Sequence, residues 1–229
     1  MFKNKLNLLI LIMVIAIIVS GCSISFKTED NGINDGGVYV TINKGDNWQQ
    51  KVLIPTTTGR PKSINTLSAN VLAMDPNDSG AIYFGSVDNG LFYTYNGAKE
   101  WFIAKNLDKI TINDVVIDSS SKCIIYAAIG NRVYKSTDCN RSWSQVYYDN
   151  DVNTIINSIV IDHYNSANVY IGTSRGEIIK SSNRGVSWQT LGRFKGDVEK
   201  IIISPHDSRL IFVATSKKGI YRSNDSGIN

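Results

Sequence analysis

VYKSTDCNRSW, residues 133–143, sets the pattern from which most of this chain is built. The pattern is an apolar pair, then Ser/Thr-x-Asp/Asn, a turn, and a tryptophan seven positions after the Ser or Thr. Further copies align with it at VYVTINKGDNW (38–48), LFYTYNGAKEW (91–101), IIKSSNRGVSW (178–188) and IYRSNDSGIN (220–229). The last copy stops one residue before its tryptophan is due, which predicts a fragment of a longer chain. The recurrence indicates repeated structural units.

Each unit contains short runs rich in β-branched and aromatic residues, separated by Asp, Asn, Ser and Gly, which is typical of strands joined by tight turns. Within one unit, for example, INDVVID, CIIYAAI, RVYKST and SWSQVYY follow one another. Four strands in a repeat of roughly 40 to 50 residues is the signature of a propeller blade. The sequence therefore predicts an all-β fold, an incomplete β-propeller arc of about four blades. The predicted boundaries are a partial unit at 37–54, units at 64–107, 110–150 and 154–194, and a partial unit at 197–229.

The Ser/Thr-x-Asp/Asn-x-Gly-x-x-Trp segments resemble the Asp-box, or BNR, repeat of sialidases, sortilin-type receptors and photosystem II assembly-factor propellers, within the broad WD40/YVTN/BNR-like superfamily. That resemblance implies that the box is the turn between the third and fourth strands of a blade. A hydroxyl and a short polar side chain can both bond nearby backbone N–H groups there, and the tryptophan can fill the space between blades. The residues assigned this structural role are Thr41, Asn43, Trp48, Thr94, Asn96, Trp101, Ser136, Asp138, Trp143, Ser181, Asn183, Trp188, Ser223 and Asp225.

The N-terminal segment predicts export. MFKNKLNLLILIMVIAIIVSGC has two lysines, an apolar stretch and a small-residue exit, as a signal peptide requires. Its ending resembles the bacterial lipobox, which implies a signal peptide over 1–21, diacylglycerol on Cys22 and anchoring to a membrane on its extracytoplasmic side. An uncleaved anchor is the alternative. Residues 22–36 are polar and rich in Gly, Asn and Asp, so they predict a flexible tether.

Charge does not select a partner class. The formal net charge is +4, and two of the 24 basic residues, Lys3 and Lys5, belong to the predicted signal peptide. Without a basic run, no nucleic-acid partner is predicted. In a propeller, the turns between second and third strands and the connections between blades lie at one rim. Candidate binding residues in those loops are Arg60, Arg132, Arg175, Arg193, Lys217 and Lys218. A mixed, solvated rim is the competing interpretation.

The two remaining cysteines, Cys123 and Cys139, lie in one predicted hairpin. A two-residue turn at Gly130-Asn131 places Cys123 opposite Asp138, one position from Cys139. A disulfide and two separate thiols both remain open at this stage. The histidines, His163 and His206, have no ligand-spaced partners, so no metal or cofactor is predicted.

Two functions and a third, blander possibility remain open. The first is a non-catalytic, lipid-anchored scaffold that binds or assembles a protein partner. The second, which resemblance to the sialidases and xyloglucanases implies, is a glycoside hydrolase acting on a glycan at the rim or in further blades. The third is a degraded reading frame. Glu29, Glu100, Glu177 and Glu199 are the glutamates, none is expected in the rim loops, and the carboxylate pair considered is Asp88 with Asp151.

Overall fold

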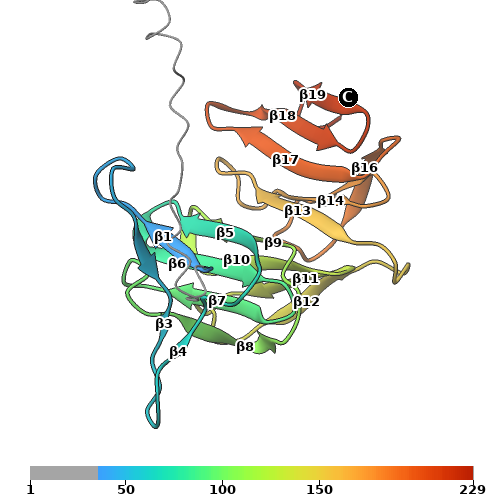
Figure 1. The fold of residues 1–229 in the computed structure, drawn as a ribbon. Helices are drawn as coiled ribbons and strands as arrows, with labels where there is room; N and C mark the ends of the chain where they lie inside the picture. The colour runs from blue at the N-terminus through green and yellow to red at the C-terminus, as the bar shows by residue number, and fades with distance from the viewer. Residues whose placement is uncertain (1–35, 229) are drawn as a thin grey trace, which may run out of the picture. The chain divides into compact units, whose positions relative to one another are not determined.

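The computed structural model describes residues 36–228 (Figure 1). The predicted signal peptide, Cys22 and nearly all of the predicted tether lie outside the described residues. Within residues 36–228 every regular element is a β-strand, and no helix is present that is long and apolar enough to cross a membrane.

The strands form successive antiparallel sheets, which we name blades 1 to 4. Blade 1 contains β5 (Ala69–Asp75), β6 (Asp78–Ser86), β7 (Gly90–Thr94) and β8 (Phe102–Asp108). Blade 2 contains β9 (Asp114–Asp118), β10 (Ser121–Ile129), β11 (Arg132–Ser136) and β12 (Ser144–Tyr148). Blade 3 contains β13 (Ile156–Ile161), β14 (Val169–Thr173), β15 (Glu177–Ser181) and β16 (Gln189–Arg193). Blade 4 contains β17 (Val198–Ser204), β18 (Asp207–Thr215) and β19 (Gly219–Ser223). Two short pairs precede them, β1 (Val38–Val40) with β2 (Gln49–Lys51) and β3 (Leu53–Ile54) with β4 (Lys62–Ser63).

In every blade each strand pairs with its neighbour in sequence, and the first strands of consecutive blades lie against one another. Thus β5 contacts β9, β9 contacts β13, and β13 contacts β17. This is the arrangement of propeller blades around an axis, so the predicted all-β propeller of about four blades is confirmed.

The core consists of apolar layers between consecutive blades. Tyr83 and Leu91 of blade 1 pack with Ile125 of blade 2, for example, and all three are essentially buried. Similar layers join blade 2 to blade 3 and blade 3 to blade 4. Because each inner blade is covered on both faces, its second strand is apolar at consecutive positions rather than alternating, as in the fully buried strand β14.

The turns between third and fourth strands repeat one hydrogen-bonded geometry. The Ser136 hydroxyl donates to Asp138 Oδ1 at 2.9 Å and accepts from the backbone N–H of Asn140 at 2.9 Å. The same pair of bonds forms at the four other copies of the pattern. Asn140, which stands where other copies have glycine, has φ 68° and so adopts the left-handed conformation that Asn tolerates.

The tryptophans of these turns tie a blade to the segment before it. The Trp188 indole N–H donates to the Val146 carbonyl of blade 2 at 2.9 Å. Trp101 is fully buried, and its indole N–H donates to the Lys51 carbonyl at 2.8 Å. Trp143 instead bonds Asn140 Oδ1 within its own turn, and Trp48 is half exposed.

Side chains of one blade also bond the innermost strand of the next. Asp114 Oδ2 accepts the Ile159 N–H at 3.0 Å, and Ser158 Oγ accepts the Ile201 N–H at 3.1 Å. Asp114 also accepts the Lys200 ammonium of blade 4 at 2.8 Å. These bonds occupy backbone donors at strand edges that no neighbouring strand satisfies.

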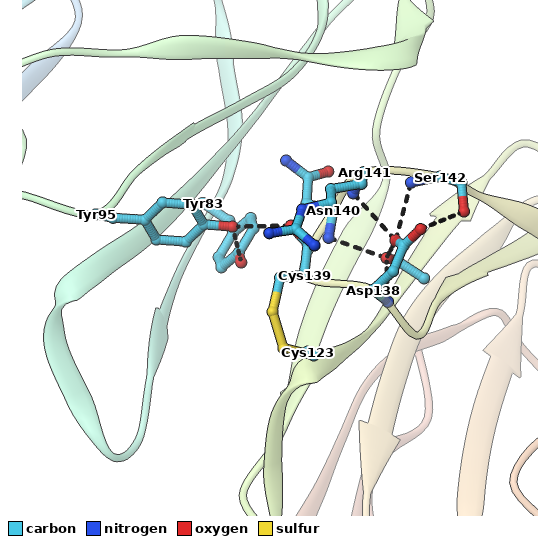
Figure 2. The surroundings of a disulfide bond; sticks show 9 residues. Tyr83, Tyr95, Cys123, Asp138, Cys139, Asn140, Arg141 and Ser142 are labelled. Atoms are coloured by element: carbon cyan, nitrogen blue, oxygen red, sulfur yellow. Dashed lines mark hydrogen bonds between the residues drawn. A yellow bond between two sulfur atoms is a disulfide. The ribbon is translucent and has the colours of Figure 1, made fainter.

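Cys123 and Cys139 form a disulfide within blade 2 (Figure 2). The strand register runs from Ile129 opposite Arg132 to Ile125 opposite Ser136, as the two-residue turn requires. The Cys139 N–H also donates to the Cys123 carbonyl at 3.2 Å. The disulfide therefore closes the end of a hairpin that backbone pairing already aligns.

Candidate functional site

The candidate site lies where blades 2 and 3 meet, at the rim to which the sequence assigned binding residues. The connection between β12 and β13 crosses the β10–β11 turn there, since the Asp149 N–H donates to the Asn131 carbonyl at 2.9 Å and the Asn131 amide returns a bond to the Asp149 carbonyl at 2.8 Å. The β14–β15 turn contributes Arg175. Loops from two blades are thus held together by main-chain bonds.

An ion-pair network centres on Arg175. Its guanidinium lies 2.9 Å from Asp149 Oδ2, 3.7 Å from Asp151 Oδ2 and 2.7 Å from Glu177 Oε2. The other oxygen of Glu177 lies 2.6 Å from the Arg193 guanidinium. The Glu177 hydrogen bond, assisted by the charges of Asp149 and Asp151, raises the pKa of Arg175 above its ordinary value. Arg175 is therefore a permanent cation surrounded by carboxylates.

Aromatic side chains border this network. The Tyr147 hydroxyl donates to Asp149 Oδ2 at 3.3 Å, and its ring meets Trp188 edge to face at 5.4 Å. Burial, followed by the charge of Asp149, raises the pKa of Tyr147, so its hydroxyl stays protonated as a donor. The Tyr148 ring is 41% exposed, with the Arg132 guanidinium 5.5 Å from its centroid.

A hollow of about 450 Å³ opens among these groups. Its lining consists of Tyr147, Tyr148, Asp149, Asn150, Asp151 and Arg175. Asp149 is nearly buried, whereas Asp151 and Arg175 are partly exposed. The surface can offer an incoming group both aromatic area and charge of either sign.

The structure brings together three of the predicted rim residues and separates the others. Arg132, Arg175 and Arg193 belong to the network or border it. Arg60 is exposed between β3 and β4, and Lys217 and Lys218 are exposed in the β18–β19 turn. Within residues 36–228 no ion pair joins these three to the network.

The expectation that no glutamate serves this rim was wrong for Glu177. It is the first residue of β15, directly after the loop, and pairs across the sheet with Arg193. That cross-strand pairing was available from the hairpin register, since opposite charges facing each other on neighbouring strands are favourable. Tyr147 and Tyr148 were missed because they end a strand and were counted as structural.

The carboxylate pair considered for catalysis is not joined in the structure. Asp88 lies in the β6–β7 turn of blade 1, where its Oδ1 accepts the Thr111 hydroxyl at 2.8 Å. Asp151 belongs to the Arg175 network of blades 2 and 3. Among the described residues they share no hydrogen-bond or ion-pair partner.

No cluster of three or more His, Cys, Asp or Glu side chains suited to a metal ion occurs in residues 36–228. The carboxylates of the rim are engaged with arginine. The arrangement is suited to polar recognition.

Comparison with known proteins identifies the fold. No protein-family model and no curated protein sequence matches the chain. Among solved structures, a GH74 enzyme of Niastella koreensis has TM-score 0.65 and 17% identity over 84% of this chain and 34% of that one. The extracellular domain of a putative hybrid two-component system of B. thetaiotaomicron has TM-score 0.59 and 13% identity over 82% of this chain and 25% of that one.

YCF48 bound to D1 peptide has TM-score 0.50 and 16% identity over 73% of this chain and 55% of that one. The chain thus spans between a quarter and about half of the length of these three structures. At such identities the similarity shows the propeller fold, which catalytic and non-catalytic proteins share.

Proposed function

We propose that the chain is an exported, lipid-anchored β-propeller of the Asp-box class that binds a protein partner through the rim of blades 2 and 3. The observation that carries the proposal is the Arg175 network with its exposed aromatic border. Tyrosine and arginine dominate the energetically important positions of protein interfaces. Here Tyr148, Arg132 and Arg193 are all accessible around one hollow.

The network also supports binding over catalysis. Glycoside hydrolysis uses one carboxyl group as general acid and a second as nucleophile or base. Asp149 and Glu177 are instead engaged in short ion pairs with arginines. Such pairs hold the rim side chains in one arrangement before a partner arrives, which lowers the entropic cost of association.

Export and anchoring rest on the sequence from Met1 to Cys22 and on the tether after it. One of the structures with the same fold is printed as an extracellular domain, which supports an extracytoplasmic location. Lipid on Cys22 would hold the blades near a membrane surface, so that a membrane-associated partner would be met at high effective concentration.

Site-specific photo-crosslinking in membranes tests the proposal. A photoreactive phenylalanine analogue is placed at Tyr148, and a matched control is placed at Tyr164, which is exposed at the opposite ends of the blade 3 strands. We expect one discrete crosslinked species from position 148, lost with Arg175→Ala. The same species from position 164, or none from position 148, would contradict binding at this rim.

A glycoside hydrolase is the second candidate, favoured by the fold shared with GH74 enzymes and by three carboxylates around one hollow. Asp151 is the carboxylate of the network with the longest contact to arginine, so it is the residue to change. Release of oligosaccharides from xyloglucan that is lost in Asp151→Asn and retained in Asp88→Asn would establish the enzyme. Absence of hydrolysis by the unaltered chain would leave the binding function as the better account.

A further inference from the structure

A repeated bridge connects the second strand of one blade to the Ser/Thr-x-Asp/Asn turn of the next. The Tyr126 hydroxyl donates to the Arg184 carbonyl at 2.9 Å, and the Tyr170 hydroxyl donates to the Ser226 carbonyl at 3.4 Å. A lysine of the third strand lies over each ring, with Lys135 Nζ 5.2 Å from the Tyr126 centroid. Lys135 Nζ also bonds the Arg184 carbonyl at 2.9 Å. The lysine thus fills the space beside the bridge.

The junction of blades 1 and 2 departs from this scheme (Figure 2). Tyr83 occupies the position of Tyr126, but its hydroxyl meets the hydroxyl of Tyr95 at 3.3 Å. Tyr95 in turn donates to the Cys139 carbonyl at 3.2 Å. Tyr93 stands opposite Tyr83, where a lysine stands opposite Tyr126 in blade 2. A second tyrosine is therefore inserted into the bridge, and the filling lysine is absent from its place.

The departure opens a cleft, which we name the tyrosine cleft. It consists of two hollows of about 420 and 260 Å³ that share Tyr95, Cys139 and Arg141. The Tyr93 and Tyr95 rings lie 5.2 Å apart, and Tyr93 lies 5.8 Å from Phe102. Tyr95 is 48% exposed. These rings form an accessible aromatic wall.

Cations without an ion-pair partner line the same cleft. Lys105 and Arg141 line the larger hollow, and Lys122 with Arg141 lines the smaller one. Within residues 36–228 none of the three forms an ion pair. Asp75 and Asp78 line only the smaller hollow, where each accepts a backbone N–H of its own turn at 2.9 and 3.0 Å. The larger hollow is therefore aromatic and positively charged.

We propose that the tyrosine cleft binds an acidic peptide segment. An aromatic or apolar side chain of the segment packs on Tyr93 and Tyr95, and a neighbouring carboxylate pairs with Arg141, assisted by Lys105. An arginine guanidinium can grip a carboxylate through two parallel hydrogen bonds, and the surrounding rings exclude water from that contact. The cleft lies on a different blade junction from the Arg175 network, so this site is independent of the function proposed above.

The disulfide contributes to the site. Cys139 supplies the carbonyl that receives Tyr95, and Arg141 follows it by two residues in the same turn. Tying Cys139 to Cys123 fixes the turn to β10, so the guanidinium and the aromatic wall are positioned before a ligand arrives.

Titration of the 22–229 chain with defined peptides tests this site. The probe is a blocked pentapeptide of one tryptophan between two pairs of glutamates, and the comparison peptide has glutamine in place of every glutamate. Backbone amide shifts locate binding, and their saturation gives Kd. We expect shifts confined to residues 93–105 and 139–142, with Kd about tenfold larger for the glutamine peptide and for Arg141→Ala.

Two variants control the measurement. Arg60→Ala removes an exposed cation elsewhere, and Arg175→Ala disrupts the rim of blades 2 and 3; both should leave Kd unchanged. Because the Arg141 side chain forms no ion pair among the described residues, its variant should also keep the unfolding temperature of the parent chain. Equal binding of both peptides, or an unchanged Kd in Arg141→Ala, would overturn the proposal. So would tighter, Arg141-dependent binding of oligogalacturonate, which would assign the cleft to an acidic glycan.

Discussion

Replacing Asp114 tests how the innermost strands of consecutive blades are joined. The carboxylate is almost fully buried, and its Oδ2 accepts the Ile159 N–H and the Lys200 ammonium. In Asp114→Ala, the Ile159 donor is left buried without an acceptor, which costs about 1–3 kcal/mol. The lost pair with Lys200 adds about 1 kcal/mol at most, because that ammonium is half exposed and returns to water.

The expected loss for Asp114→Ala is therefore about 2–4 kcal/mol of unfolding free energy. For a chain of this size each kcal/mol lowers the unfolding temperature by about 2–4 °C. Two variants separate the contributions. Ser158→Ala removes only a neutral acceptor from the Ile201 N–H, for about 1–2 kcal/mol. Lys200→Ala removes only the exposed partner, for less than about 1 kcal/mol.

Urea titration of the 22–229 chain, with thermal unfolding alongside, measures these differences. The expected order of destabilisation is Asp114→Ala, then Ser158→Ala, then Lys200→Ala. If Lys200→Ala destabilised the chain as much as Asp114→Ala, the ion pair would be the dominant contact. Capping of the strand edge would then be the wrong explanation.

Three further predictions concern the turns and the packing of the blades. Changing both Cys123 and Cys139 to Ser should cost about 2–3 kcal/mol in urea titration, because the closed loop is short and backbone bonds already align its ends; no change would mean that the bond adds nothing to the hairpin. The Ser142 hydroxyl and N–H, with lesser help from Ser136, lower the pKa of Asp138 to about 2 from 3.8, so its contribution to stability is present above pH 3.8 and is lost as the pH falls through 2; carboxyl NMR should show that midpoint, and Asp138→Asn should flatten the urea midpoint between pH 4 and 2. Gly172→Ala should cost about 1–3 kcal/mol in thermal unfolding, because its added Cβ would overlap the Val198 side chain of the next blade; an unchanged unfolding temperature would contradict close packing there.

The repeat made the fold predictable from sequence. VYKSTDCNRSW and its copies mark the same turn in each blade, and their spacing leaves room for four strands and no helix. The two-residue turn Gly130-Asn131 also determined the register of β10 and β11, because hairpin register follows loop length. These features depend on local pattern, which a single sequence contains.

The sites were less predictable because they depend on contacts across blades. Arg175 was recognised as a rim cation, but its partners Asp149 and Glu177 come from two different blades. The tyrosine cleft was missed altogether. Tyr93 and Tyr95 satisfy the strand and turn pattern of the repeat, and their exposure follows from what blade 2 lacks beside them.

Departures from the repeat therefore point to function more directly than the repeat itself. A position that bonds in the same way in every blade is explained by packing, as the tyrosine bridges of blades 2 and 3 are. At the junction of blades 1 and 2, Tyr95 lengthens that bridge and leaves rings and cations open to solvent. Stability does not explain an exposed aromatic wall beside unpaired cations, since both are better satisfied when covered. A ligand that supplies apolar area and negative charge together would cover both.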